Sequence, residues 1–222
     1  MIRGMSPHLI AASLPLLAYL LGSLSGSLLL GRLRGVDIRR LGSGNAGGTN
    51  ALRTQGWKFA LGVVLVDVGK GALAVWLALR FAPDGGFADA VALGHLAALA
   101  AVIGHVWPVW HGFRGGKGAA TAIGGLLLLW PWSLAVVLPA WLLVLACSGY
   151  VGLSTVVAFA CLPALAWWDG ATPWRTGFAV ALALFIAFTH RGNLQRLRAG
   201  TELRFERARL LPRLLQRLAA RP

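Results

Sequence analysis

The chain alternates between long apolar runs and short polar segments, and the lengths of the runs predict helices that span a membrane. A hydrocarbon core about 30 Å thick requires roughly 20 apolar residues in a helix. The runs are continuous, whereas the strands of a membrane barrel alternate apolar and polar positions. The predicted helical segments are residues 8–30, 57–82, 88–110, 119–130, 131–147, 151–168 and 173–191.

The apolar run over residues 119–147 is too long for one straight span. It contains Pro131 and Pro139, and proline interrupts helical hydrogen bonding. We therefore expect a short helix near 119–130 and a second helix near 131–147. The fold class that follows is an all-α integral membrane protein, a polytopic bundle of about seven transmembrane helices. The number falls to five or six if segment 119–130 does not cross.

Composition separates this chain from soluble basic proteins. It is 57% hydrophobic with a mean hydropathy of +0.70, and 13% of its residues are charged. Water-soluble domains carry about a quarter charged residues, and nucleic-acid binders are usually richer still. The net charge of +14 therefore does not indicate a nucleic-acid partner. The partner that the composition indicates is the lipid bilayer.

The positions of the basic residues predict how the chain is oriented. Segments 31–58, 111–118 and 190–222 hold six, two and nine of the 21 Lys and Arg residues. Seven crossings place all three segments on one side of the membrane. Because basic loops are retained in the cytoplasm, we expect that side to be cytoplasmic. The N-terminus then lies outside and the C-terminus inside.

We expect a single polytopic catalytic domain over residues 1–202 and a basic amphipathic tail over residues 203–222. In the tail, leucines recur at helical spacing with arginines between them. That pattern is typical of a helix lying on an anionic leaflet. The alternative is a frayed, solvated tail.

The first of three polar segments runs from Gly42 to Arg53. Its glycines allow backbone N–H groups to approach an anion closely. Arg53 adds a bidentate charge suited to phosphate. The alternative is a flexible linker between two helices.

The second polar segment runs from Gly104 to Thr121 and leads into a predicted helix. Free N–H groups and the helix dipole make such a loop a ready anion site, in which Lys117 is a point charge. It is not a Walker A loop, because Lys117 is followed by Gly118 and not by Ser or Thr. A basic loop at the membrane edge is the alternative.

The third polar segment follows the last apolar run. His190 and Asn193 are three residues apart, so they share a face of a helix. On its own, His190 would be interpreted as a surface residue at the membrane edge. Three anion-suited segments on one membrane face indicate a phosphorylated substrate.

The three segments together resemble the bacterial acyl-phosphate-dependent glycerol-3-phosphate acyltransferases, the PlsY family. The motifs are GSGNAGGTNALR (42–53), GHVWPVWHGFRGGKGAAT (104–121) and HRGNLQRLRAGTE (190–202), and the resemblance covers roughly residues 19–202. It implies transfer of a fatty acyl group from acyl phosphate to the 1-hydroxyl of sn-glycerol 3-phosphate. The products are lysophosphatidic acid and phosphate, in the first acylation step of phospholipid synthesis.

The resemblance has further implications for cofactors, location and partners. An acyl phosphate is already activated, so neither a metal nor a cofactor is expected. The expected location is the bacterial cytoplasmic (inner) membrane, with the site on its cytoplasmic face. Functional coupling to the enzyme that makes acyl phosphate is also implied.

The resemblance also implies roles for individual residues. Arg53 binds phosphate, and Ser43 hydrogen-bonds a substrate phosphate or hydroxyl. The acyl phosphate's own oxygen takes the hydroxyl proton, and His190 positions substrate; a general base is the alternative role for His190. The implied catalytic residues are Ser43, Arg53, Lys117, His190 and Asn193. The implied substrate-binding residues are Gly44, Asn45, Gly47, Thr49, Asn50, Gly115, Gly116, Gly118, Thr121 and Ser154.

Two further features of the sequence need an interpretation of their own. The family usually has serine where this chain has Gly152, which leaves Ser154 to supply that role. Asp67 and Lys70 lie inside a predicted span, where charges are costly and usually paired or functional. An ion pair that braces the bundle is one interpretation, and a role in the phosphate cleft is the other.

Two other functions use the same features. A phosphate transporter would also have spans and basic loops, but inverted repeats are typical of that class and none is visible here. A non-catalytic membrane scaffold would not explain the loops rich in Gly, Ser and Asn.

Overall fold

A computed structural model describes residues 6–210, and every regular element in this part of the chain is a helix. This confirms the all-α prediction. The α-helices are α1 (Pro7–Gly22), α2 (Gly26–Leu33), α3 (Gly48–Gln55), α4 (Trp57–Phe81), α5 (Ala90–Val106), α6 (Ala119–Leu129), α7 (Leu134–Ser148), α8 (Val151–Trp168), α9 (Pro173–Thr189) and α10 (Arg191–Arg198). The short 3-10 helices are η2 (Ile38–Arg40), η3 (Val109–His111), η4 (Pro131–Ser133) and η5 (Glu206–Ala208).

Length and composition allow up to six of these segments to cross a membrane. Four are α4, α5 with the turn that follows it, η4 with α7, and α8. The other two are bent pairs, α1 with α2 at 43° and α9 with α10 at 54°. Helix α6 is apolar but has only 11 residues. The chain is thus a multi-pass membrane protein, and its seventh crossing stays a prediction.

The predicted segment 8–30 is not one straight helix, because the chain bends between Gly22 and Gly26. Ser23 donates its hydroxyl to the carbonyl of Tyr19 at 2.9 Å, and Ser25 has an extended backbone. Serine side chains compete with the helix for backbone hydrogen bonds. Three serines within five residues therefore favour a break that the hydrophobic pattern does not reveal.

The predicted division of residues 119–147 is confirmed at Pro131, which starts η4 after α6 has ended. The expectation that Pro139 also interrupts the helix is wrong, because it lies inside α7. A proline within a helix removes one hydrogen bond, which membrane helices tolerate. The helix predicted over residues 173–191 ends at Thr189, and α10 continues the chain at 54° to α9.

Contacts group the chain into two compact units, one ending at Pro131 and the other beginning at Trp132. The single domain over residues 1–202 stays a prediction. In the tail, residues 203–210 contain η5, and the remainder of the predicted amphipathic helix lies outside the described residues.

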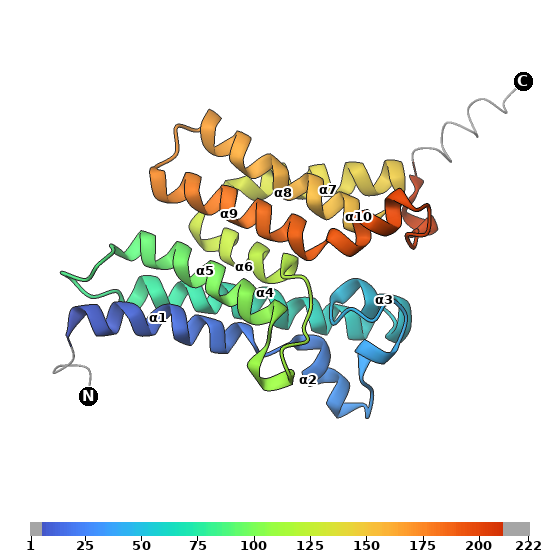
Figure 1. The fold of residues 1–222 in the computed structure, drawn as a ribbon, viewed down its shortest axis with the longest axis horizontal. Helices are drawn as coiled ribbons and strands as arrows, with labels where there is room; N and C mark the ends of the chain where they lie inside the picture. The colour runs from blue at the N-terminus through green and yellow to red at the C-terminus, as the bar shows by residue number, and fades with distance from the viewer. Residues whose placement is uncertain (1–5, 211–222) are drawn as a thin grey trace, which may run out of the picture. The chain divides into compact units, whose positions relative to one another are not determined.

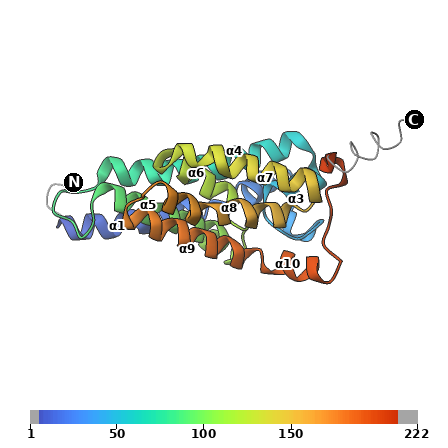
Figure 2. The ribbon, with the colours of Figure 1, turned by 90° about the horizontal axis from the view of Figure 1, so that it is seen from above.

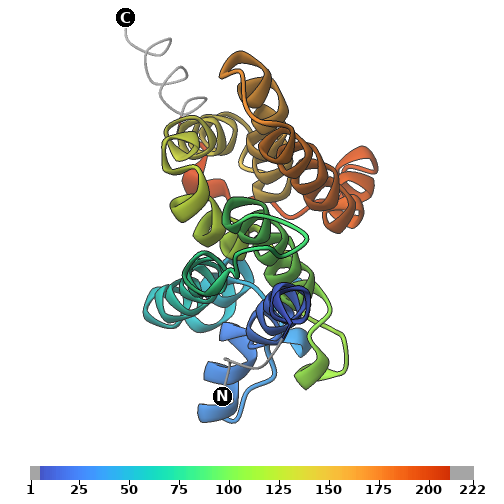
Figure 3. The ribbon, with the colours of Figure 1, turned by 90° about the vertical axis from the view of Figure 1, so that its left-hand side faces the viewer.

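Glycines hold the helices of the first unit close together. Helix α1 packs on α4 and α5, and α6 packs on the same two helices (Figures 1 and 3). A Cβ built on Gly22 would overlap the backbone of Ala101, and one on Gly104 would overlap that of Tyr19. Gly71 and Gly124 make equivalent backbone contacts between α4 and α6. Small residues that let backbones approach are typical of helix packing in membranes.

The outward faces of both units are apolar. Leu65 on α4 is 64% exposed, and Leu143 on α7 and Leu184 on α9 are 64% and 66% exposed. Soluble proteins rarely expose large contiguous apolar surfaces. These faces are suited to lipid.

The second unit is a bundle of α7, α8 and α9, with α10 packed on α8 and α9 (Figure 2). Gly149, at φ +76°, makes the tight turn from α7 to α8. The N–H of Phe205 donates to the carbonyl of Gly149 at 2.8 Å, which ties the segment after α10 to that turn.

Candidate functional site

The first polar loop is organised around the buried side chain of Asn50. Its Nδ2 donates to the carbonyls of Ile38, Leu41 and Asn45 at 3.1, 2.9 and 3.1 Å. Its Oδ1 accepts from the backbone N–H of Ser43 at 3.0 Å. The side-chain amide of Asn50 thus folds the loop, and its predicted contact with substrate stays a prediction.

The other predicted residues of this loop surround the start of α3. Gly44, at φ +72°, lies in a left-handed turn, and the exposed Ser43 precedes it. Gly47 is the N-cap residue of α3 and has an extended backbone, and as a glycine it offers no side-chain hydrogen bond to the first N–H groups of the helix. Asn45 and Thr49 are half-buried, and Arg53 lies in the last turn of α3, also half-buried. The loop thus presents a hydroxyl and backbone donors around one short helix, which also carries the guanidinium of Arg53.

Arg39 joins the first loop to the second. Its Nη1 donates to the carbonyls of His111 and Arg114 at 3.0 and 3.2 Å. Its Nε and Nη2 donate to the carboxylate of Asp37, with an Nη2–Oδ2 distance of 2.9 Å. This hydrogen-bonded ion pair lowers the pKa of Asp37 to about 2 and raises the pKa of Arg39. The two loops are therefore held by a charged bridge.

The second loop enters α6 through glycines that leave no room for side chains. The N–H groups of Gly115 and Gly116 donate to the carbonyls of Val106 and His105, both at 3.1 Å. A Cβ on Gly116 would overlap Nε2 of His105 and lie 2.7 Å from the carbonyl oxygen of Ala46. The close approach of Gly116 to Ala46 brings the two predicted anion-binding loops into contact.

Lys117 follows directly and is half-buried, and Gly118, at φ +89°, is the N-cap residue of α6. Thr121, in the first turn of α6, is 1% exposed. Its hydroxyl has no hydrogen-bond partner among the described residues. The arrangement places a cation, backbone N–H groups and a buried hydroxyl at one helix N-terminus, which suits an anion.

The third segment lies in the second unit. His190 is buried at the junction of α9 and α10, and its Nδ1 lies 2.8 Å from the carbonyl of Ile186. Because a carbonyl only accepts, a neutral His190 carries its proton on Nδ1 and has Nε2 as its acceptor. The surface position considered for His190 is therefore wrong.

Asn193 is held by Glu202. Its Nδ2 donates to Oε1 of Glu202, whose Oε2 accepts from Nε of Arg196 at 2.8 Å. This carboxylate fixes the orientation of the Asn193 amide. Ser154 is buried on α8 and donates its hydroxyl to the carbonyl of Tyr150 at 2.8 Å.

The structure thus brings together the residues of the first two motifs in one unit and those of the third motif, with Ser154, in the other. Sequence reasoning did not assign His105, although it stands beside Gly104 in the second motif. It also did not assign Arg39 as the bridge between loops. The one indication in the sequence that His105 has buried polar neighbours was the presence of Asp67 and Lys70 inside an apolar segment.

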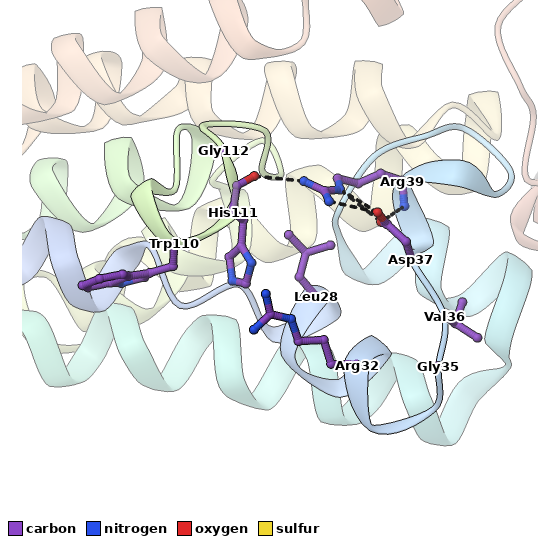
Figure 4. A pocket seen from close by; sticks show the side chains of 9 residues that line it. All are labelled: Leu28, Arg32, Gly35, Val36, Asp37, Arg39, Trp110, His111 and Gly112. Carbon is purple, nitrogen blue, oxygen red and sulfur yellow. Dashed lines mark hydrogen bonds and ion pairs between the residues drawn. The ribbon is translucent and has the colours of Figure 1, made fainter.

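A cavity of about 530 Å³ lies in the first unit, between the end of α2 with the residues that follow it and the turn η3 (Figure 4). Arg32, Asp37, Arg39, Trp110 and His111 are among its lining residues. The imidazole of His111 points toward Arg32, and its Nε2 has no hydrogen-bond partner among the described residues. None of the predicted site residues is among those that line this cavity.

No group of three or more His, Cys, Asp or Glu side chains within residues 6–210 has the arrangement of a metal site. The chemistry that the loops can perform with their own residues is anion binding and stabilisation of negative charge.

Comparison with known proteins gives a consistent result. A model of the family described as glycerol-3-phosphate acyltransferase matches residues 12–200. Glycerol-3-phosphate acyltransferases of Synechococcus sp. and Rhodospirillum rubrum are 47% and 44% identical to this chain over 200 and 201 residues. The matches cover 88% and 89% of this chain and 96% and 92% of the two relatives.

Two solved structures have a similar fold. Both are of PlsY (YgiH), an integral membrane glycerol 3-phosphate acyltransferase, and both are 32% identical to this chain. The glycerol 3-phosphate form has a TM-score of 0.81 and covers 88% of this chain and 95% of its own. The lysophosphatidic acid form has a TM-score of 0.80 and covers 90% and 98%.

Proposed function

Because this chain belongs to the glycerol-3-phosphate acyltransferase family, we propose that it transfers a fatty acyl group from acyl phosphate to the 1-hydroxyl of sn-glycerol 3-phosphate. The products are lysophosphatidic acid and inorganic phosphate. The observation that carries the proposal is the contact of two glycine-rich loops at Ala46 and Gly116. Each loop carries one of the cations proposed to bind phosphate, Arg53 and Lys117.

The second loop is the proposed site of the glycerol 3-phosphate phosphate group. Lys117 supplies charge, and the N–H groups around Gly118 lie at a helix N-terminus that favours an anion. The buried hydroxyl of Thr121 is available as a further donor. Gly115 and Gly116 are proposed to bind through their backbone, and their missing Cβ atoms let this loop lie against His105.

The first loop is the proposed site of the acyl phosphate group. Arg53 binds the phosphate, and Ser43 contributes a hydrogen bond from an exposed position. Gly44, Asn45, Gly47 and Thr49 shape the backbone donors before α3, and Asn50 keeps that backbone folded.

In the reaction, the 1-hydroxyl oxygen attacks the acyl carbonyl carbon, and the bond between that carbon and the phosphate oxygen breaks. The hydroxyl proton passes to the departing phosphate. Lys117 or Arg53, with backbone N–H groups, stabilises the oxyanion of the tetrahedral intermediate. Tenfold acceleration corresponds to about 1.4 kcal/mol of such stabilisation.

His190 and Asn193 position substrate in this scheme. With Nδ1 directed at the carbonyl of Ile186, His190 has an acceptor nitrogen suited to a substrate hydroxyl. Glu202 orients the Asn193 amide. Ser154 lies one turn into α8 from Tyr150, and its buried hydroxyl is a further proposed contact to substrate.

The proposed topology has seven crossings, with the N-terminus outside and the C-terminus and active site at the cytoplasmic face of the bacterial inner membrane. In the second unit, Trp167 and Trp168 are 84% and 75% exposed at the end of α8 away from Tyr150. Tryptophans gather at membrane interfaces, so this end marks one surface. The enzyme that makes acyl phosphate is the proposed functional partner.

The test uses purified protein with acyl phosphate and labelled glycerol 3-phosphate, without metal or coenzyme A. Formation of labelled lysophosphatidic acid is expected, and acyl-CoA should not replace the donor. Lys117→Ala and Arg53→Ala should each lower turnover at least about a hundredfold, as loss of a transition-state donor does. Wild-type turnover in both variants would show that the site is assigned wrongly, and activity with acyl-CoA alone would exclude the proposed donor.

Orientation is tested separately with a C-terminal epitope tag in intact cells. The tag should resist external protease until the membrane is opened. Digestion in intact cells would contradict the proposed topology without affecting the reaction.

A further inference from the structure

Asp67, Lys70 and His105 form a buried cluster between α4 and α5. Nζ of Lys70 lies 3.0 Å from Oδ1 of Asp67 and 2.8 Å from Nδ1 of His105. The three residues are 1%, 6% and 3% exposed. The predicted ion pair of Asp67 and Lys70 is therefore present, and a histidine of the second motif joins it.

Asp67 and Lys70 also complete the backbone hydrogen bonds where α1 and α2 separate. Nζ of Lys70 donates to the carbonyl of Leu24 at 2.9 Å, and the N–H of Gly26 donates to Asp67 at 3.0 Å. Unsatisfied backbone groups are costly within a membrane. This bracing role explains the charged pair, but it leaves His105 without an explanation.

The lysine sets the hydrogen-bonding state of His105. Nδ1 of His105 lies 2.8 Å from the ammonium of Lys70, which only donates, and 3.4 Å from Oδ1 of Asp67, which only accepts. In the shorter contact Nδ1 accepts, which puts the proton of the neutral ring on Nε2. That edge of the ring faces Gly116, where a Cβ would overlap Nε2. A Cβ on Gly115 would overlap the carbonyl oxygen of His105, which itself accepts from the N–H of Gly116 at 3.1 Å.

His105 therefore supports the second loop with both its ring and its backbone. The Cβ position of Gly116 is also close to the carbonyl oxygen of Ala46 in the first loop. A change in the angle of the ring would move Gly116, and Lys117 follows it in the chain. Displacements of about 1 Å at a binding site lower rates about a hundredfold.

We propose that Asp67, Lys70 and His105 form a positioning site, in which the charged pair holds the His105 ring against Gly116 and so sets the loop that binds glycerol 3-phosphate. The inference rests on the proposed function, because it takes residues 115–118 as the glycerol 3-phosphate site. The three residues act through the loop and do not contact the substrate.

The first test removes the charged pair without leaving an unpaired charge, in the double variant Asp67→Asn/Lys70→Met. Replacing a buried ion pair as a unit is often tolerated, whereas removing one partner is not. We expect the KM for glycerol 3-phosphate to rise about tenfold or more, which is the effect of losing one hydrogen bond to a charged group. The KM for acyl phosphate should stay within about twofold of wild type.

Val75→Ala is the matched control, because Val75 is fully buried on the same helix and has no place in the cluster. It should lower the melting temperature and leave both KM values unchanged. A wild-type KM for glycerol 3-phosphate in the double variant would overturn the inference, and so would an equal rise in Val75→Ala.

The second test measures coupling between His105 and Gly116 by a double-mutant cycle. Gly116→Ala should weaken glycerol 3-phosphate binding about tenfold because the new methyl group displaces the ring. In the His105→Ala background the same change should weaken it by clearly less than in the wild-type background, since the ring is absent and only the contact with the carbonyl oxygen of Ala46 remains. A role in stability alone would not produce this rescue, and additive effects would overturn the inference.

Binding is measured by calorimetry with glycerol 3-phosphate and no acyl donor. This separates the inference from the proposed reaction. If wild-type protein binds glycerol 3-phosphate with the expected coupling but does not use acyl phosphate, the donor is wrong and the positioning site stands. If the reaction proceeds and the cycle is additive, the positioning site is wrong and the function stands.

Discussion

Gly152 on α8 and Asn193 on α10 approach so closely that no side chain fits between them. A Cβ on Gly152 would lie 2.7 Å from Cβ of Asn193 and 2.8 Å from its Cγ. Atoms of real side chains do not approach this closely without displacement. The absence of a side chain at position 152 is therefore what allows Asn193 to lie where it does.

We expect Gly152→Ala to push Asn193 away from Glu202 and to lower turnover about tenfold or more, as small misplacements of positioning groups do. Gly177→Ala on α9 is the control, because a Cβ there would meet no atom within 4 Å. Steady-state kinetics of the two variants checks this. Equal activity in both would show that the contact between Gly152 and Asn193 does not matter for the reaction.

Asn50→Ala should destabilise the protein. The change removes side-chain hydrogen bonds to three carbonyls and one N–H group. Each buried polar group left without a partner costs about 1–3 kcal/mol, so a total of at least about 2 kcal/mol is expected. Asn50→Asp should be similarly harmful, because a carboxylate cannot donate to carbonyls.

Thermal unfolding in detergent measures this effect, with Gln55→Ala at the end of α3 as the control. A melting temperature of Asn50→Ala equal to that of the control would contradict the organising role.

The ion pair of Asp37 and Arg39 should add stability at neutral pH and lose it in acid. The pKa of Asp37 is about 2 in the folded protein against 3.8 for the ordinary group, so the contribution is present above about pH 4 and is lost as the pH falls toward 2. The pair is partly exposed, so we expect less than about 1 kcal/mol. The measurement is the difference in melting temperature between wild type and Asp37→Asn from pH 7 downward. A difference that grows in acid would have the wrong sign.

Two glycines on α4 should respond oppositely to the same substitution. A Cβ on Gly71 would overlap the backbone carbonyl of Thr121 on α6, whereas one on Gly69 would meet nothing within 4 Å. Gly71→Ala should therefore destabilise by about 1–3 kcal/mol through overpacking. Gly69→Ala should stabilise by up to about 1 kcal/mol, since alanine favours the helix. Equal melting temperatures would show that α4 and α6 do not pack as described.

Helix positions were largely predictable because they depend on local patterns. The boundaries of α4 and α8, at residues 57–81 and 151–168, agree with the predicted segments to within one residue. The division of the chain at Pro131 was predictable for the same reason, since proline acts on its own helix. The break before α2 was missed because it depends on serine hydroxyls that bond the backbone.

The roles of polar residues were less predictable because they depend on contacts distant in sequence. Asn50 stands within a binding motif, yet its amide is occupied by the loop. Arg39 reaches carbonyls more than 70 residues away. Neither contact leaves a periodic signal in the chain.

The sequence alone determined the helical membrane class, the family and the two glycine-rich loops, because hydrophobic length and motif spacing are local properties. Only the tertiary structure decided that Gly116 meets Ala46 and that His105 joins Asp67 and Lys70. The physical reason is that a buried polar group must find a partner wherever the fold provides one. That partner is chosen by packing and not by proximity in the chain.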